Sequence, residues 1–243
     1  MKLNIPSDGT KIGHDGERLV VPDNPIIPYI IGDGIGIDVT PVMKRVLDYA
    51  VNKAYGNTRE IKWLELYAGS NSKELYGSIL PEETIEAMKE YRISIKGPLT
   101  TPIGKGHKSI NVQIRQKLDL FACVRPIKYF PGTSTPMAES GLTDMVVFRE
   151  NTEDLYSGIE WEPNSPGAKR IIDFINKELG HSPFRFEDNC GIGIKPVSEE
   201  GTKRLIRMAI DYSLALNKTS ITAVSYTHLR AHETLRYLVC RLL

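Results

Sequence analysis

The apolar residues in the first half of the chain alternate between short β-branched runs and stretches with helical spacing. Residues 1–25 are rich in Gly, Pro and Asp, and we expect loops or short hairpin strands there. The elements expected next are a strand at 26–31, a helix at 38–54, a strand at 61–67, a helix at 82–91 preceded by Pro81, and a short strand at 93–96. This alternation predicts an α/β architecture with a largely parallel sheet.

The second half continues with shorter elements. These are a helix at 111–118, strands at 121–127, 145–149 and 191–195, a helix from Ser198 to about Leu216, and a strand at 220–224. Ser198 suits the start of its helix because its hydroxyl can accept a hydrogen bond from the first turn. Glu199 and Glu200 follow it, where the helix dipole favours negative charge. Residues 151–197 are less regular and show few periodic elements of their own.

Composition and charge narrow the class of protein. Of 243 residues, 41% are hydrophobic, and 31 basic side chains face 30 acidic ones. A net charge of +1 without a basic stripe argues against binding to nucleic acid or to a membrane surface. The three cysteines are widely spaced, which fits a reducing compartment, and no apolar run approaches membrane-spanning length. These features predict a cytoplasmic soluble protein.

A glycine-rich loop, GDGIG at residues 32–36, stands between the first expected strand and helix. The dinucleotide fingerprint requires the spacing G-x-G-x-x-G, so that its third glycine permits close packing of helix on strand. The spacing here is different, and no acidic residue stands where ribose recognition would need it. A tight strand-to-helix turn is therefore the favoured interpretation.

The segment TTPIGKGHKSINVQIRQKLDLFACVRP concentrates groups suited to a small polyanion. Ser109 is placed to cap the helix at 111–118, with its hydroxyl near the positive end of the helix dipole. Arginine suits carboxylates because its planar fork donates two parallel hydrogen bonds. The candidate ligands of a di- or tricarboxylate are Ser109, Asn111, Arg115, Arg125 and Arg149.

Each candidate also has an ordinary structural explanation, because a lone helical arginine is usually solvated and Ser109 could be only a helix cap. The order of the whole set decides between these readings. KGPLTTPIGKGHKSINVQIRQKLDLFACVRP, TDMVVFRENTEDLYSGIEW and GIGIKPVSEEGTKRLIRMAI are similar, in this order, to the NADP-dependent isocitrate dehydrogenases of the dimeric bacterial type. The resemblance covers roughly residues 20–222. The related 3-isopropylmalate dehydrogenases share the arginines but lack the Ser109–Asn111 pair.

The resemblance implies oxidative decarboxylation of isocitrate to 2-oxoglutarate with reduction of NADP⁺, a step of the tricarboxylic acid cycle. It implies that the five candidate ligands bind the substrate carboxylates. Tyr156 matches the family's catalytic tyrosine, although alone it would pass for a half-buried aromatic residue. Thr100, otherwise a loop threonine, matches a residue at the nicotinamide end of NADP. Ser109 matches a serine that is phosphorylated in some bacterial members.

The resemblance also implies a large and a small domain with a segment that interlocks two subunits, here in incomplete form. The expected divisions are 1–120 for part of the large domain, 121–153 and 198–222 for part of the small domain, and 154–197 for the interlocking segment. Partners would be isocitrate and a second copy of the chain, in a homodimer with shared active sites.

The resemblance fails near residue 223. The position expected to hold the catalytic lysine is Tyr226, and its ordinary pKa of about 10 makes it a poor substitute in a proton relay. Residues 223–243 are therefore interpreted as an unrelated tail, with a divergent terminal helix as the alternative. The Mg²⁺ or Mn²⁺ of the family would be held by aspartates beyond this end, so no metal ligand is assigned. The alternative functions are a non-catalytic fragment and a related homoisocitrate or isopropylmalate dehydrogenase.

Overall fold

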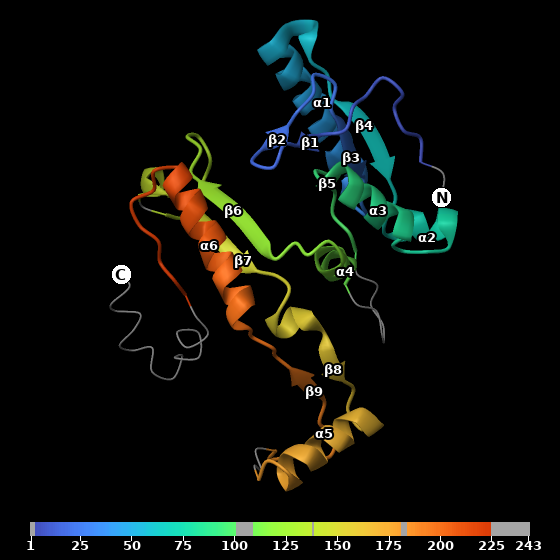
Figure 1. Ribbon diagram of the computed structural model, residues 1–243, viewed down its shortest axis with the longest axis vertical. Coiled ribbons are helices and arrows are strands. Elements are labelled where there is room, and N and C mark those ends of the chain that lie inside the picture. The colour runs from blue at the N-terminus through green and yellow to red at the C-terminus, as the bar shows by residue number, and fades with distance from the viewer. Residues whose placement is uncertain (1–2, 101–108, 138, 181–183, 225–243) are drawn as a thin grey trace. The chain divides into compact units, whose positions relative to one another are not determined.

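The computed structural model describes residues 3–100, 109–137, 139–180 and 184–224. These fall into two compact units. Figure 1 labels their helices and strands. The first contains the described residues up to Phe121 together with Asp154–Lys195, and the second contains Ala122–Glu153 and the described residues from Pro196 onward. The domain division drawn from the sequence stays a prediction.

A parallel sheet forms the centre of the first unit. Its strands are β3 (Ile26–Ile30), β4 (Lys62–Leu66) and β5 (Ile95–Lys96), in the order β4-β3-β5. The helices between them are α1 (Gly36–Tyr55), α2 (Ser70–Tyr76) and α3 (Glu82–Tyr91), with the short 3-10 helix η1 (Gly56–Thr58) after α1. The expectation of an α/β protein with a parallel sheet is confirmed.

The core of this unit joins the sheet to α3 and to the later helix α4 (Ile110–Lys117). Leu64 and Leu66 of β4 are 0% and 1% exposed, and Ile85 and Tyr91 of α3 are also buried. Ile110 of α4 belongs to the same cluster. Burying each such side chain contributes about 1.5–3 kcal/mol, so the cluster holds α4 firmly against the sheet.

The outer face of α1 lies outside this core. The sequence places Val42, Val46, Leu47 and Ala50 on one side of the helix. In the structure Val42 is 55% and Val46 60% exposed, and Tyr49 beside them is 70% exposed. Within the described residues, therefore, this apolar stripe is not covered.

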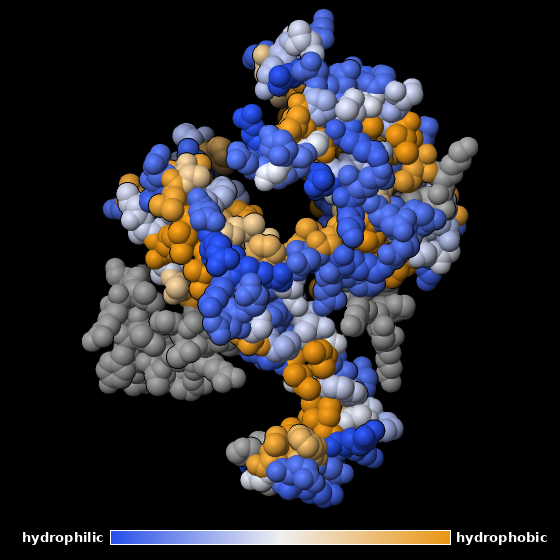
Figure 2. Space-filling view, in the orientation of Figure 1, coloured by the Kyte–Doolittle hydropathy of each residue, from blue (hydrophilic) through white to orange (hydrophobic). Residues whose placement is uncertain are grey.

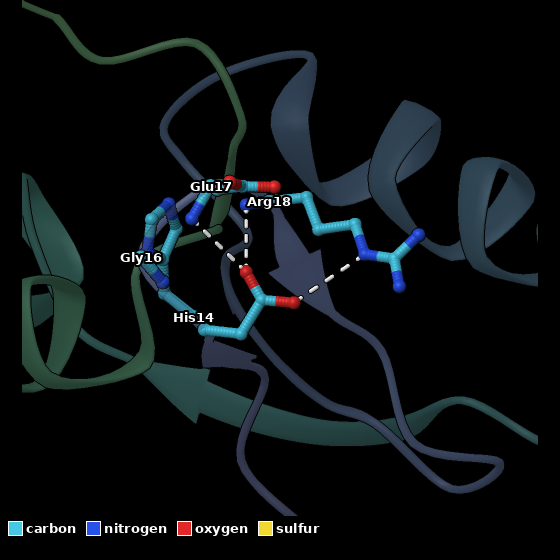
Figure 3. Close-up of polar contacts among 5 residues, drawn as sticks. His14, Gly16, Glu17 and Arg18 are labelled. Atoms are coloured by element: carbon cyan, nitrogen blue, oxygen red, sulfur yellow. Dashed lines mark hydrogen bonds and ion pairs between the residues drawn. The ribbon is translucent and has the colours of Figure 1, made fainter.

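An antiparallel hairpin of β1 (Gly13–His14) and β2 (Leu19–Val20) precedes the sheet, as the sequence suggested. Figure 3 shows the polar contacts at its turn. The Asp15 carboxylate accepts hydrogen bonds from the backbone N–H groups of Arg18 at 2.9 Å and Glu17 at 3.0 Å. The N–H of Gly16 donates to Nδ1 of His14 at 2.9 Å. The two N–H groups facing Asp15 favour its charged form and hold its pKa below the usual value.

The segment Asp154–Lys195 contains η3 (Asp154–Ser157), β8 (Ile159–Trp161), α5 (Pro166–Lys177) and β9 (Ile192–Ile194), with β8 and β9 antiparallel. The amphipathic helix α5 was not expected. Its signals were present, because Ser165 accepts a hydrogen bond from the N–H of Ala168 and Pro166 occupies the first turn. Ala168 and Ile172 are its buried residues, four positions apart.

The second unit is a hairpin covered by a helix. β6 (Ala122–Lys128) pairs antiparallel with β7 (Asp144–Glu150), after the 3-10 helix η2 (Ser140–Leu142), and α6 (Glu199–Ala215) contacts β7. The rings of Phe148 and Tyr212 lie 5.4 Å apart in an edge-to-face arrangement. The Ser198 hydroxyl accepts from the N–H of Gly201, so its predicted capping role is confirmed.

The strand predicted at 220–224 is not formed, so that prediction was wrong. Residues 218–222 and Val224 line a groove of about 510 Å³ beside Asp144–Phe148 of β7 and residues of α6. A β-strand is stable only when its backbone groups are paired, and the described part of this segment has no strand partner. No helix among the described residues is long and apolar enough to cross a membrane.

Candidate active site

Helix α4 carries three of the predicted ligands at and after its amino end. Ile110 and Ile114 are 1% and 3% exposed and anchor the helix in the core. Ser109 occupies the N-cap position, and Asn111 and Arg115 are half-buried, one turn apart. Contrary to expectation, the Ser109 side chain makes no capping hydrogen bond to this helix. Its backbone, with φ of −51° and ψ of 129°, is not helical, so the helix begins after this residue.

Asn111 presents a buried acceptor to this site. Its Oδ1 atom is buried and has no hydrogen-bond partner among the described residues. A buried polar atom without a partner costs about 1–3 kcal/mol, so native structures usually satisfy it. A ligand hydroxyl or water at the amino end of α4 would do so, which fits a polar ligand.

Lys96 adds a positive charge that sequence reasoning did not select. Desolvation lowers the pKa of Lys96, the charge of Arg115 lowers it further, and Asp33 opposes both. A cation near enough to lower the pKa of Lys96 makes this part of the unit favourable for an anionic ligand. The sequence signal was its place at the carboxyl end of β5, where open α/β sheets bind ligands.

Thr100 and Tyr156 both connect to this part of the first unit. The backbone N–H of Thr100 donates to Oδ2 of Asp33 at 2.8 Å, and the residue is exposed. Tyr156, in η3, is half-buried, and its backbone carbonyl accepts a hydrogen bond of 2.5 Å from Nε2 of Gln116 in α4. The Asp154 and Lys195 side chains, at the two ends of this segment, pair at 3.2 Å.

Arg125 and Arg149 belong to the second unit and lie on one face of the β6–β7 hairpin. Arg125 pairs with Val147, and Arg149 pairs with Cys123. Directly opposed residues share a face, so the two arginines are diagonal neighbours with Cα atoms about 7–8 Å apart. Both are exposed, on the face opposite to Phe148, whose ring contacts α6. One carboxylate-bearing ligand could contact both side chains.

The structure thus gathers the predicted residues into two groups. Ser109, Asn111, Arg115, Thr100 and Tyr156 belong to the first unit, and Arg125 and Arg149 to the second. Among the described residues no group of three or more His, Cys, Asp or Glu side chains could hold a metal ion. The fold and these charged groups define a two-unit α/β protein in which each unit carries groups suited to binding a small polyanion.

Comparison with known proteins identifies the family to which this chain belongs. The family model for isocitrate/isopropylmalate dehydrogenase matches residues 26–242, and the chain belongs to that family. It is 55% identical to "Isocitrate dehydrogenase [NADP] 1" of Colwellia maris over 92% of this chain and 54% of that protein. It is 50% identical to "Isocitrate dehydrogenase [NADP]" of Pseudomonas aeruginosa with the same coverage. The chain therefore spans about half the length of the curated relatives it matches.

Solved structures give the same result. The crystal structure of isocitrate dehydrogenase from Methylococcus capsulatus is similar with a TM-score of 0.61 and 33% identity, over 80% of this chain and 49% of that one. The TT0538 protein from Thermus thermophilus is similar with a TM-score of 0.57 and 30% identity, over 87% and 36%.

Proposed function

We propose that the protein to which this chain belongs oxidises isocitrate to 2-oxoglutarate and carbon dioxide while reducing NADP⁺. The names of the relatives support the substrate and the cofactor. The observation that carries the proposal is helix α4, whose buried isoleucines anchor Asn111 and Arg115, with Arg115 near enough to affect the charge of Lys96. Isocitrate-dependent formation of NADPH by the complete protein tests it.

Charge and geometry support the proposed binding roles. Isocitrate carries three carboxylates, and each arginine can donate two parallel hydrogen bonds to one of them. Arg115 would bind from α4, and Arg125 and Arg149 from the hairpin face that they share. Ser109 and Asn111 would bind beside the positive end of α4. Holding the substrate at several points aligns its reacting carbon and lowers the entropic part of the barrier.

The proposed proton donor is Tyr156. NADP⁺, when bound, supplies the hydride acceptor, and Thr100 would contact its nicotinamide end. After carbon dioxide leaves, the Tyr156 hydroxyl would donate a proton to carbon of the resulting enolate. The bond from Gln116 to the Tyr156 carbonyl would fix the segment that carries this side chain. The resemblance implies that the substrate hydroxyl proton would pass to a lysine at the position that Tyr226 occupies in this chain, which lies outside the described residues.

The proposed reaction also uses a divalent metal ion. The described residues contain no suitable cluster of acidic, His or Cys side chains. We propose that Mg²⁺ or Mn²⁺ is bound by residues of the complete protein that this chain does not include.

We further propose a cytoplasmic homodimer joined through Asp154–Lys195. Figure 2 shows hydrophobic residues gathered over β8, β9 and α5. Ile159 is 40%, Ile194 43% and Phe174 52% exposed, and apolar area of this kind is stabilised when a partner covers it. A concentration-dependent monomer–dimer equilibrium that substitution of Phe174 by Glu shifts to monomer is the expected result in sedimentation.

Ser109 is proposed as a regulatory phosphorylation site. A phosphate dianion at this position would repel the substrate carboxylates and obstruct their access to Asn111 and Arg115. Treatment of the complete protein with the cognate kinase should abolish activity, and a protein that the kinase leaves unmodified would remove this proposal.

The tail after residue 222 favours one alternative. If SYTHLRAHETL is the natural sequence, the protein lacks the expected lysine and is a non-catalytic fragment. Sequencing the encoding DNA through and beyond codon 222 from an independent sample decides this. Continuation into a histidine, a lysine and acidic metal ligands supports the dehydrogenase, and confirmation of the tail supports the fragment.

A further inference from the structure

The GDGIG loop has a contact that a simple turn does not explain. Gly32, with φ of +92°, lies so close to the loop after β5 that a Cβ atom would stand 2.2 Å from the carbonyl oxygen of Pro98. No side chain fits in this space. Two loops that follow neighbouring parallel strands are thus pressed against each other at the carboxyl edge of the sheet.

The Asp33 carboxylate connects its own loop to the segments that follow β4 and β5. It is 9% exposed, and its Oδ1 accepts from the N–H of Ser70 and its Oδ2 from the N–H of Thr100, both at 2.8 Å. Its own N–H donates to the carbonyl of Pro98 at 2.6 Å. Gly69, with φ of +85°, permits the close approach, because a Cβ atom there would lie 2.5 Å from Oδ2.

The same carboxylate influences the cationic part of the site. Its negative charge raises the pKa of Lys96 against the opposing effects of desolvation and Arg115. Asp33 therefore contacts the Thr100 loop directly and supports the charged form of Lys96 through space.

We propose that Asp33 is a positioning residue that holds Thr100 at the place where the nicotinamide end of NADP binds. This rests on the proposed function, in which Thr100 contacts that part of the cofactor. The glycine-rich loop then serves the cofactor site without binding phosphate. A charge-assisted hydrogen bond is stronger than a neutral one, so its loss should displace the Thr100 loop while leaving the carboxylate ligands on α4 in place.

The test compares three variants of the complete enzyme with wild type. Asp33→Asn replaces one acceptor oxygen by an NH₂ group that cannot accept from a backbone N–H. Gly69→Ala keeps the carboxylate but fills its space. Asp38→Asn is the matched control, because Asp38 is an exposed aspartate in the first turn of α1. KM for NADP⁺ and for isocitrate, kcat and Tm are measured for each.

We expect Asp33→Asn and Gly69→Ala to raise KM for NADP⁺ about tenfold, corresponding to one charge-assisted hydrogen bond, with KM for isocitrate within about twofold of wild type. Asp38→Asn should match wild type. Hydrogen exchange of the Thr100 and Ser70 amides should accelerate in Asp33→Asn.

Other outcomes overturn the proposal. Equal rises in both KM values with a lowered Tm indicate a merely structural role. An unchanged KM for NADP⁺ in both folded variants excludes positioning of Thr100. A wild-type enzyme without isocitrate-dependent NADP⁺ reduction overturns the proposed function itself, and the nicotinamide role falls with it.

Discussion

The side-chain amide of Gln116 donates a hydrogen bond of 2.5 Å to the backbone carbonyl of Tyr156, 40 residues further along the chain. This bond links the helix that carries Asn111 and Arg115 to the segment that carries the expected proton donor. The proposed substrate-binding residues on α4 and the proposed proton donor therefore depend on one helix for their placement.

Replacing Gln116 by Glu should lower kcat of the complete enzyme about tenfold, because an acceptor then faces the Tyr156 carbonyl and the hydrogen bond is lost. KM for isocitrate should change less than twofold, since the arginines are untouched. Steady-state kinetics measure both. An unchanged kcat would show that this bond does not position Tyr156.

Replacing Arg125 or Arg149 by Lys should raise KM for isocitrate about tenfold or more, because lysine cannot form the bidentate pair. Lys128→Ala is the control, since Lys128 lies on the other face of β6. The relevant measurement is KM at constant ionic strength. Equal effects of the control and the arginine variants would count against a shared carboxylate site on this face.

Ser198→Ala should destabilise the protein by about 1 kcal/mol, because the hydroxyl caps α6 at the N–H of Gly201. Thermal or urea unfolding at neutral pH measures this loss. Thr202→Ala is a useful comparison one turn later, where the hydroxyl bonds the Ser198 carbonyl without capping an N–H. If Ser198→Ala destabilises the protein no more than Thr202→Ala does, the cap contributes little.

The contact between Ser198 and the Glu153 carboxylate predicts that the stability of the protein depends on pH. The Ser198 hydroxyl and then its backbone N–H hold the pKa of Glu153 below its usual value of 4.5. A depressed folded-state pKa contributes stability that is fully present above about pH 4.5 and is lost as the pH falls through the folded-state value. Glu153→Gln should therefore flatten the acid limb of a stability–pH curve. A parallel curve for the variant would contradict this assignment.

The uncovered stripe on α1 predicts self-association of the 243-residue chain. Val46→Glu should reduce association because it places a charge in the centre of exposed Val42, Val46 and Tyr49. Arg45→Glu, an exposed neighbour, controls for the change of charge. Sedimentation velocity would show fewer large species for Val46→Glu alone. Equal behaviour of the two variants would place the association elsewhere.

Local signals in the sequence predicted much of the fold. Pro81 before α3 and Ser198 before α6 marked helix starts, and alternating apolar runs gave the parallel sheet. The prediction of a strand at 220–224 was wrong because β-propensity cannot supply a pairing partner. Asp33 escaped notice because its partners, Ser70 and Thr100, are 37 and 67 residues away. Only the folded chain brings their backbone N–H groups to one carboxylate.

The most direct test of the account is the rate of NADP⁺ reduction by the complete protein with isocitrate, homoisocitrate and 3-isopropylmalate as competing substrates. We predict activity with isocitrate that exceeds the others by about 100-fold or more in kcat/KM, because 3-isopropylmalate lacks one of the carboxylates that the polar groups bind and the extra methylene of homoisocitrate displaces one. The 243-residue chain, which has Tyr226 at the expected lysine position, should be inactive. Preference for another substrate, or turnover by the 243-residue chain, would contradict the account.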